Sequence, residues 1–350
     1  TGNGGDDIMQ GGFGDDTFIF ADGWSGANGD TIIEDAGQGT DTLDFSRVTA
    51  NITFTLGSLV ILDSNSNKVT HVGDNIERLI GGSGNDSFLF SAEGVKFAAG
   101  SGTMNGGQGN DTISYAAYTS SVSVNLATGT ATNTGGISNI ENATGGAGAD
   151  ILTGNSAANI LTGNAGDDVI TGAGGSDTLI GGPGNDTFIF ADNWGVDSLS
   201  DTLGVSDHLN FSVVTTHLTF TIAAGSLIVS DGVNTLTHTG NTIERLTGGS
   251  GNDTFKFSSD GVQLAAGFGV INGGPGLNAL DYSAYTTTLV EVDLALGKAN
   301  GTAGVSKIQK VIGGANNIIN GDANDNILVS GPGNDILRGQ GGNDTYVFLD

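Results

Sequence analysis

Aspartate recurs at one fixed position of a nine-residue repeat, and this regularity is the feature of the sequence that is best suited to chemistry. From Gly145 the chain reads GGAGADILT, GNSAANILT, GNAGDDVIT, GAGGSDTLI and GGPGNDTFI, a pattern G-G-x-G-x-D-x-U-x in which U is a large apolar residue. The sixth position is aspartate at Asp7, Asp16, Asp86, Asp111, Asp150, Asp168, Asp177, Asp186, Asp253, Asp335 and Asp344, and Asp41 in GQGTDTL resembles a variant of the same turn.

Oxygen-rich turns of this kind suit calcium. This hard cation takes six to eight oxygen ligands, from carboxylates and backbone carbonyls, at about 2.3–2.6 Å. Two glycine-rich turns stacked on one another would supply carbonyls and aspartates around one ion, whereas the same carboxylates without a cation would repel. Aspartate and glycine are also common turn residues, so a purely turn-forming role is the alternative. That alternative does not require the nine-residue phase, and we therefore expect multiple Ca²⁺ ions as the cofactor.

The repeat predicts an all-β fold. A glycine-rich hexapeptide followed by x-U-x is a tight turn followed by a short strand with one inward side chain, and such side chains stack as coils accumulate. Between the nonapeptides lie alternating stretches typical of strands, such as ITFTL (52–56), SLVIL (58–62), SVSVNLA (121–127) and LTFTI (218–222). We expect a parallel β-roll or β-solenoid with calcium between the stacked Gly/Asp-rich turns, interrupted by longer β-coils, with little helix.

A longer period encloses the short one and sets the expected domains. GGFGDDTFIFADGW returns as GGPGNDTFIFADNW, and Tyr115 and Tyr118 return as Tyr282 and Tyr285. We expect residues 1–10 to end a preceding repeat unit, 11–180 and 181–338 to form two β-roll units, and 339–350 to start a third. The array is accordingly expected to continue on both sides.

Composition narrows the class of protein. The chain has 62 glycines among 350 residues, 38 acidic against 10 basic side chains, and a formal charge of −28. Only 3 prolines and a hydrophobic content of 37% argue against a disordered linker. The acidic excess disfavours nucleic acid and anionic membranes as partners, and no apolar run is long enough to span a bilayer. Because cysteine is absent, disulfides and zinc–thiolate sites are excluded.

Catalytic motifs are missing, so we expect no enzyme within these residues. His71 and His238 occupy matching places, but no H-E-x-x-H or G-x-S-x-G motif accompanies them, which favours a structural role at a strand end. Paired carboxylates for glycoside cleavage stay an open alternative because acids abound. Glu77 and Glu244 are interpreted as partners of Arg78 and Arg245 or as solvent-facing. Trp24 and Trp194 are either a ligand platform or, as we prefer, covers of the excursion after FIFAD.

The nonapeptide resembles the repeats-in-toxin (RTX) calcium-binding repeat of secreted bacterial proteins, whose known fold is a parallel β-roll. The segments Val122 to Gly146 and Val290 to Gly314 are similar to inter-repeat segments of large hemolysin-type proteins. The resemblance implies that first and third repeat positions offer carbonyls and the sixth a side chain. By that implication Gly163, Ala165 and Asp168 form one ligand set, and Gly181, Pro183 and Asp186 another. It also implies type I secretion, unfolded at low calcium, with folding outside the cell.

Several coils depart from the pattern. Asn159, Asn278, Asn317 and Asn326 replace the sixth-position aspartate, so we expect these coils to bind calcium weakly or to remain metal-free. GVSDHLNF lacks a glycine that is present in GQGTDTLDF, which leaves a site at Asp207 in doubt. On this basis the first copy is expected to hold more ions than the second.

Two function hypotheses follow. The first is a calcium-binding structural segment of a very large secreted protein, acting as an extender, adhesin stalk or surface lattice or filament component. The alternative is the calcium-dependent folding and secretion domain of an exported enzyme or toxin. Both place the chain outside the cell or on a bacterial surface, largely unfolded without calcium. Apart from calcium, the expected partners are further copies of the repeat, through self-association at exposed solenoid ends, with no nucleic acid and no membrane insertion.

Overall fold

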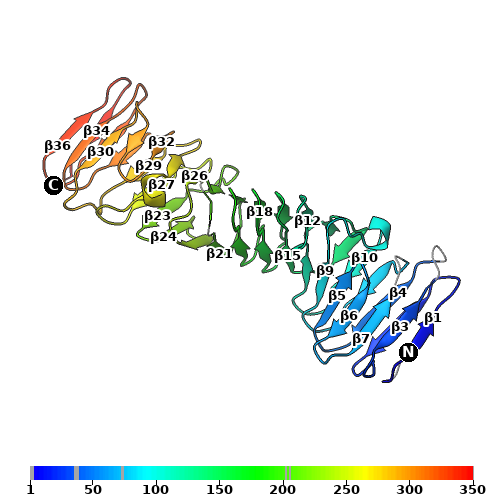
Figure 1. The fold of residues 1–350 in the computed structure, drawn as a ribbon. Coiled ribbons are helices and arrows are strands. Elements are labelled where there is room, and N and C mark those ends of the chain that lie inside the picture. Colours follow the sequence, from blue (N-terminus) through cyan, green and yellow to red (C-terminus); the bar gives the residue numbers. More distant parts are fainter. Residues whose placement is uncertain (1–3, 35–38, 72–74, 202, 205, 350) are drawn as a thin grey trace. The chain divides into compact units, whose positions relative to one another are not determined.

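The computed structural model describes residues 4–34, 39–71, 75–201, 203–204 and 206–349. The chain divides into two compact units, Thr1–Val169 and Ile170–Asp350 (Figure 1). The domain boundaries expected from the sequence lie where the long repeat returns, whereas these units are defined by contacts within the fold. The expected boundaries stay a prediction.

Short β-strands make up nearly all of the regular structure. In the first unit they are β1 (Ile8–Gln10), β2 (Thr17–Ala21), β3 (Asp30–Ile33), β4 (Thr42–Arg47), β5 (Ile52–Leu56), β6 (Val60–Asp63), β7 (Lys68–His71), β8 (Arg78–Ile80), β9 (Ser87–Phe90), β10 (Thr103–Asn105), β11 (Thr112–Ser114), β12 (Ser123–Asn125), β13 (Thr130–Ala131), β14 (Gly136–Ser138), β15 (Asn142–Thr144), β16 (Ile151–Thr153) and β17 (Ile160–Thr162). The division between units falls within β18 (Val169–Thr171).

The second unit is also built from short strands. Its strands are β19 (Thr178–Ile180), β20 (Thr187–Ile189), β21 (Val196–Ser200), β22 (His208–Asn210), β23 (Thr219–Ala223), β24 (Ser226–Ser230), β25 (Thr235–Thr239), β26 (Arg245–Thr247), β27 (Thr254–Phe257), β28 (Val270–Asn272), β29 (Ala279–Asp281), β30 (Val290–Asp293), β31 (Lys298–Ala299), β32 (Gly304–Ser306), β33 (Lys310–Ile312), β34 (Asn317–Asn320), β35 (Ile327–Val329), β36 (Asp335–Arg338) and β37 (Thr345–Val347). In the described residues the helical content is two short 3-10 turns, η1 (Ala98–Gly100) and η2 (Leu264–Gly267).

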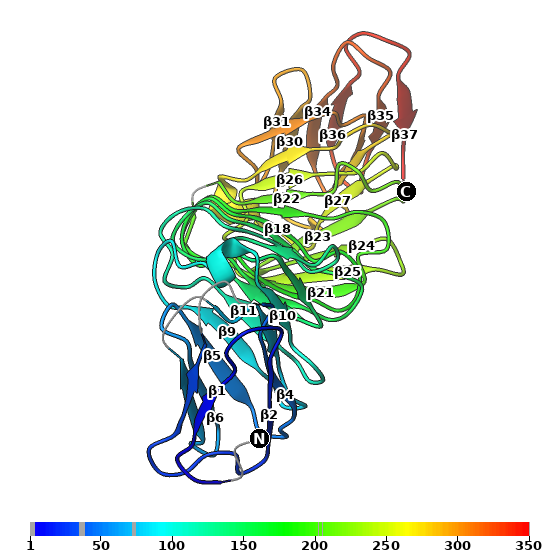
Figure 2. The same ribbon diagram turned by 90° about the vertical axis from the view of Figure 1, so that its right-hand side faces the viewer.

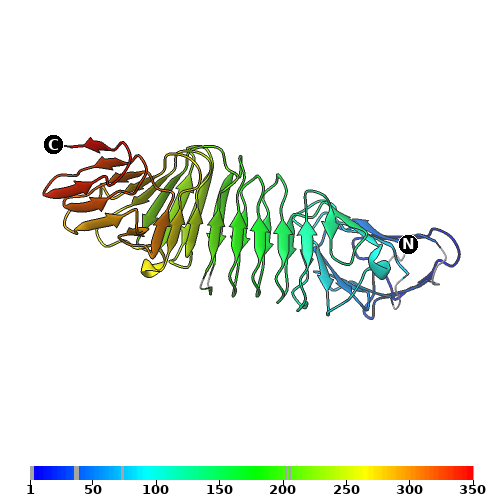
Figure 3. The same cartoon turned by 90° about the horizontal axis from the view of Figure 1, so that it is seen from above.

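Parallel stacking of the inward apolar residue builds the first unit. In one sheet β2, β4, β8, β10 and β14 pair in parallel, which aligns Phe18, Leu43, Leu79, Met104 and Ile137 in register. In another, the central residues of β9, β11, β15 and β17 align in the same way. Figure 3 shows short strands of this kind side by side in the green part of the ribbon. The aligned residues are almost fully buried. The predicted parallel β-roll, with one inward side chain per short strand, is therefore confirmed.

The second unit follows the same rule. Strands β20, β22, β26, β28 and β32 align Phe188, Leu209, Leu246, Ile271 and Val305 along the interior. Towards the C-terminus β30, β34 and β36 pair in parallel, and they lie side by side in Figures 1 and 2.

The longer stretches form antiparallel excursions within the rolls. Strands β5, β6 and β7 form an antiparallel meander in the first unit, and β23, β24 and β25 form its counterpart in the second. Trp24 is 1% exposed and packs edge-on against Phe20 and Phe45, with ring centroids 5.3 and 5.4 Å away. Trp194 is equally buried beside Phe190 and Phe211. Both tryptophans are core residues, which contradicts the ligand-platform alternative.

Paired tyrosines fasten two excursions to each core. Tyr282 and Tyr285 donate hydroxyl hydrogen bonds to the carbonyls of Asn300 (2.7 Å) and Val262 (2.9 Å). Tyr115 and Tyr118 donate in the same way to Thr132 and Val95. The recurring tyrosines of the sequence thus anchor the hairpin and the 3-10 loop of each unit.

Removing an inward side chain should destabilise the roll far more than removing its exposed neighbour. Ile271 is fully buried in β28, whereas the adjacent Val270 is 43% exposed. We expect Ile271→Ala to lower the free energy of unfolding in saturating calcium by about 2–5 kcal/mol, because a cavity is left in a stacked core. Val270→Ala should change it by about 0.5 kcal/mol. Denaturant unfolding checks both values, and equal effects would contradict the stacking of one inward residue per strand.

Candidate metal centre

Each predicted aspartate stands at the junction between a glycine-rich turn and a strand. All but one directly precede their strand, and Asp335 is the first residue of β36. Eight are buried: Asp41, Asp86, Asp111, Asp150, Asp168, Asp177, Asp186 and Asp253. Asp7, Asp16, Asp335 and Asp344 are half-buried. The repeat phase therefore brings carboxylates to the same level of successive coils.

A hydrogen-bonded ladder holds these carboxylates in place. The N–H of Asp86 donates to Asp111 Oδ1 (2.7 Å), and the N–H of Asp150 donates to Asp168 Oδ1 (2.7 Å). The second oxygen of several aspartates accepts an N–H four residues earlier, as in Gly249 to Asp253 Oδ2 (2.7 Å). Each carboxylate is thus fixed both within its own turn and against the adjacent coil.

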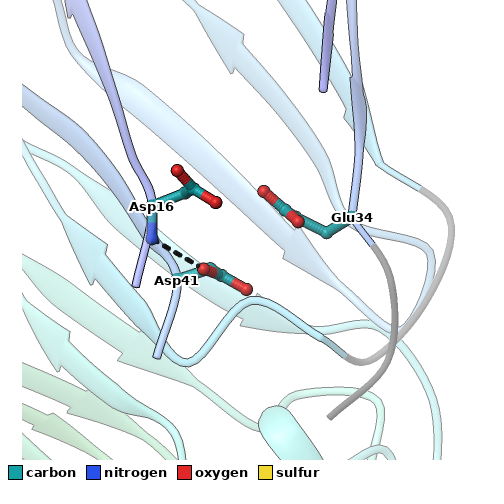
Figure 4. Close-up of side chains that lie close together, drawn as sticks. All are labelled: Asp16, Glu34 and Asp41. Carbon is teal, nitrogen blue, oxygen red and sulfur yellow. Dashed lines mark hydrogen bonds between the residues drawn. The ribbon is translucent and has the colours of Figure 1, made fainter. Parts of the chain in front are cut away.

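In the first unit, three carboxylates converge beside the strands β2, β3 and β4. One oxygen each of Asp16, Glu34 and Asp41 lies within 4.8 Å of the others, and the three side chains face one another in Figure 4. The N–H of Asp16 donates to Asp41 Oδ1 (2.9 Å), and the N–H of Gly12 donates to Glu34 Oε2 (3.2 Å). The structure brings the predicted pair Asp16 and Asp41 together and adds Glu34, which the sequence analysis missed.

The second unit contains the corresponding cluster. Asp186, Asp201 and Asp207 are all buried, and one oxygen of each lies within 4.8 Å of the others. The N–H of Asp186 donates to Asp207 Oδ1 (2.8 Å), and the N–H of Gly182 donates to Asp201 Oδ1 (3.3 Å). Asp207 therefore occupies the same kind of cluster as Asp41, despite the glycine missing from its turn. Within the described part of the chain, no other predicted aspartate belongs to a group of three such ligands.

Glycine at the first repeat position leaves room for these oxygens. A Cβ atom at Gly11 would lie 1.8 Å from Glu34 Oε1 and 2.7 Å from Asp16 Oδ2, and one at Gly181 would lie 2.3 Å from Asp186 Oδ2 and 2.6 Å from Asp201 Oδ1. At Gly145 it would meet Asp150 Oδ2 at 2.1 Å and the carbonyl of Gly163 at 2.7 Å. The space that a side chain would fill is therefore lined by carboxylate and carbonyl oxygens.

Buried carboxylate oxygens of the ladder match what a cation requires. Oδ2 of Asp16, Asp30, Asp111 and Asp197 is buried without a hydrogen-bond partner. Burying an anionic oxygen without a partner is costly, and a hard divalent cation would satisfy it. The residues present thus fit Ca²⁺.

The carbonyl ligands implied by the resemblance are placed as follows. The Gly163 carbonyl faces the Asp150 turn, as described above, and the N–H of Ala165 donates to the Gly146 carbonyl (3.2 Å). The N–H of Gly181 donates to the Ser200 carbonyl (3.2 Å), and Pro183 forms an isolated parallel bridge with Leu203. Their roles as ligands stay predictions.

Glutamates close the ladders, which corrects one interpretation from the sequence. Oε2 of Glu77 accepts the N–H of Asp41 (2.7 Å), and Oε2 of Glu244 accepts the N–H of Asp207 (2.9 Å). These side chains therefore extend the carboxylate stack instead of pairing with the neighbouring arginines, and Arg78 and Arg245 are exposed. Glu141 closes the ladder at Asp111 in the same way (2.8 Å).

In a coil with asparagine at the sixth position, the side-chain amide supplies hydrogen bonds to the turn and to the adjacent coils. Asn278 Oδ1 accepts the N–H of Asp253 (2.9 Å), while its Nδ2 donates to the carbonyls of Gly274 (3.0 Å) and Lys307 (3.1 Å). The main-chain N–H of Asn278 donates to Gln309 Oε1 (2.9 Å). The neutral Gln309 thus makes the contact here that the charged Glu77 makes with Asp41. In such a coil an N–H group occupies the carbonyl oxygens that a cation would otherwise contact.

Burial shifts the acid equilibria of the stacked carboxylates. Loss of hydration raises the pKa of Asp111 to about 7, with a further rise from the Asp86 and Glu141 charges. Burial also raises the pKa of Asp197 to about 7, with the Asp177 charge contributing. For Asp86 and Asp253, burial raises the pKa to about 6. Without a cation, these carboxyl groups therefore keep their protons to a higher pH than an exposed aspartate does.

These shifts predict an unusual pH dependence for the calcium-stripped chain. Because the folded-state pKa values exceed the unfolded value near 3.9, the contribution to stability is complete below about pH 4 and is lost as the pH rises through about 6–7. Lowering the pH of metal-free protein from 8 to 5 should therefore increase its β-structure, which circular dichroism measures. In calcium, protons compete for the same oxygens, so half-saturation should need more calcium at pH 5 than at pH 8. A metal-free chain that loses β-structure on acidification over this range would contradict the account.

Comparison with protein families agrees with this geometry. The model for the RTX calcium-binding nonapeptide repeat matches residues 1–23, 136–162, 153–188, 238–256 and 311–346. The model described as Peptidase M10 serralysin C terminal matches residues 31–135. Both are non-catalytic regions of secreted bacterial proteins. No curated protein matches the sequence. Among the described residues, no helix is long and apolar enough to cross a membrane.

The nonapeptide model covers the turns of Asp150, Asp168, Asp177, Asp186 and Asp253, and the serralysin C-terminal model covers those of Asp41, Asp86 and Asp111. Repeats of this type bind multiple Ca²⁺ ions. The chain is therefore a β-roll that carries RTX calcium-binding nonapeptide repeats.

Proposed function

We propose that calcium rigidifies this chain into a structural segment of a large secreted protein, where it acts as an extender, adhesin stalk or lattice component. The observation that carries this proposal is the pair of three-carboxylate clusters, Asp16–Glu34–Asp41 and Asp186–Asp201–Asp207, each between stacked coils of one unit. Three ionised carboxylates within 4.8 Å repel one another unless a cation lies among them. Calcium binding and formation of the roll are accordingly one process.

The two units supply corresponding sets of candidate ligands. In the first cluster, Asp16 and Asp41 come from glycine-rich turns, Glu34 follows the end of β3, and Glu77 extends the stack beyond Asp41. Asp186, Asp207, Asp201 and Glu244 occupy the corresponding places in the second unit. Calcium would supply the positive charge that these oxygens share. The other sixth-position aspartates would complete their sites with carbonyls of the adjacent turn.

The energetic contribution of such sites is large enough to decide folding. Extracellular calcium modules bind with dissociation constants of about 0.1–1 mM. At about 1 mM calcium and 0.1 mM affinity, each site stabilises the folded chain by about 1.4 kcal/mol. About eight such sites would contribute roughly 11 kcal/mol, comparable with the total stability of a typical domain.

A second function has support from one specific observation. The serralysin C-terminal match over residues 31–135 favours the calcium-dependent folding and secretion domain of an exported enzyme or toxin. The two functions differ in what surrounds the chain in its parent protein. Further copies of the 160–170-residue unit would favour the structural segment, and an adjoining catalytic domain would favour the secretion domain.

Removing one carboxylate of a cluster should remove one calcium ion. Asp16 contributes a buried oxygen with no hydrogen-bond partner, whereas its neighbour Asp15 is exposed. We expect Asp16→Asn to lower the calorimetric stoichiometry by about one ion, because a hard cation requires the charged oxygen. Asp15→Asn is the control, because it makes the same change of charge and the second unit already has asparagine at the equivalent position, Asn185. The calcium stoichiometry of Asp15→Asn should equal that of the wild type. Wild-type stoichiometry in Asp16→Asn would refute this site.

Self-association is a further part of the proposal. Parallel sheets that end in open strands can pair with another copy through their unpaired N–H and C=O groups. Light scattering should therefore detect oligomers in calcium, where the roll is formed, and monomers in chelator. Monomers under both conditions would rule out association through the rolls.

A further inference from the structure

A buried histidine stands at the same place in both units, next to the three-carboxylate cluster but not part of it. His71 ends β7 and is 2% exposed, and His238 lies in β25 and is 1% exposed. Each belongs to the last strand of an antiparallel meander, which pairs in parallel with the strand that precedes the third carboxylate of its cluster. A polar ring in such an apolar position requires hydrogen-bond partners, and these partners lead to the cluster.

In the first unit the partners form a chain of three contacts. His71 Nδ1 lies 3.1 Å from the Ile32 carbonyl, and its Nε2 lies 2.6 Å from Asn75 Oδ1. Asn75, which is also buried, donates through Nδ2 to the main-chain carbonyl of Glu34. The histidine therefore orients the amide, and the amide holds the backbone of the cluster's third carboxylate.

In the second unit a different side chain makes the equivalent connection. His238 Nδ1 lies 3.2 Å from the Leu199 carbonyl, and its Nε2 lies 3.3 Å from Thr242 Oγ1. Thr242 Oγ1 donates to the main-chain carbonyl of Asp201 (3.1 Å). Asparagine in one unit and threonine in the other thus contact the same main-chain atom of corresponding residues.

This contact matters because the third carboxylate reaches the cluster by a different route from the other two. Asp186 and Asp207 directly precede the strands β20 and β22 and are joined by the ladder hydrogen bond between coils. Asp201 instead follows the end of β21, so its approach to the cluster depends on how the main chain leaves that strand. A hydrogen bond to its carbonyl fixes this exit.

We propose that Asn75 and Thr242, oriented by His71 and His238, are positioning residues that hold Glu34 and Asp201 in calcium-binding geometry. The inference rests on the calcium site proposed above. Groups that orient metal ligands in this way typically change metal affinity by about 10–100-fold when removed. Neither residue lies in a nonapeptide turn, so the repeat pattern gives no indication of this role.

The second unit offers the sharper test, because Thr242→Val keeps the shape of the side chain and removes only the hydroxyl. Thr242→Asn installs the residue that performs the role in the first unit. Thr239→Val makes the same chemical change at an exposed position of β25. Asp201→Asn removes the charge of the ligand itself. In the full chain, stopped-flow mixing of calcium-loaded protein with a fluorescent chelator counts the ions released in each kinetic phase, and thermal unfolding in saturating calcium reports stability.

We expect Thr242→Val to transfer one ion to a faster release phase, by about tenfold or more, as Asp201→Asn does. Thr242→Asn and Thr239→Val should keep the wild-type release profile. If Thr242→Val lowers only the unfolding temperature while Asp201→Asn alone alters release, the positioning role is wrong and the calcium site stands. If Asp201→Asn also leaves every phase unchanged, the site itself fails and the inference with it.

Discussion

Carboxylates stacked at about the same level of successive coils are the constraint on which the structure depends. The ladder bonds from Asp86 to Asp111 and from Asp150 to Asp168 place one carboxylate against the next in positions that exclude water. Such an arrangement is favourable only if protons or cations neutralise it. The glycines, the thin apolar core and the acidic composition can all be understood from this requirement. Glycine leaves space for the oxygens, and most three-residue strands contribute a single inward residue to the core.

The same constraint explains why the coils are not all alike. An aspartate coil leaves carboxylate and carbonyl oxygens facing one another, whereas the Asn278 coil fills the equivalent contacts with its own amide N–H groups. The ladder-closing residue changes in parallel: Glu77 and Glu244 stand next to aspartates, and Gln309 stands next to Asn278. Charged and neutral coils therefore occur within one roll. The neutral coils, together with the buried tryptophans and tyrosines, provide packing that does not depend on metal.

Much of the fold could be predicted from the sequence, because the nine-residue phase determines where turns, strands and inward residues fall. The phase could not reveal Glu34 or Asp201, since both follow strands outside the nonapeptides, and their approach to the cluster depends on pairing across the roll. Asp207 was doubted because one glycine is missing from its turn, yet the cluster needs only that its carboxylate face Asp186. The sequence interprets Glu77 as a partner of Arg78 or as solvent-facing, whereas in the structure it accepts the backbone N–H of Asp41, 36 residues away. Local spacing identifies repeats well, but contacts between coils emerge only from the stacked structure.

We propose that the roll forms only when a cation neutralises its buried carboxylates at neutral pH. Circular dichroism of the full chain at pH 7.5, recorded in excess chelator and then during calcium addition, tests this claim most directly. We predict a largely unfolded spectrum in chelator and a cooperative gain of β-structure as calcium is added. A full β-spectrum in excess chelator, unchanged by calcium, would contradict it.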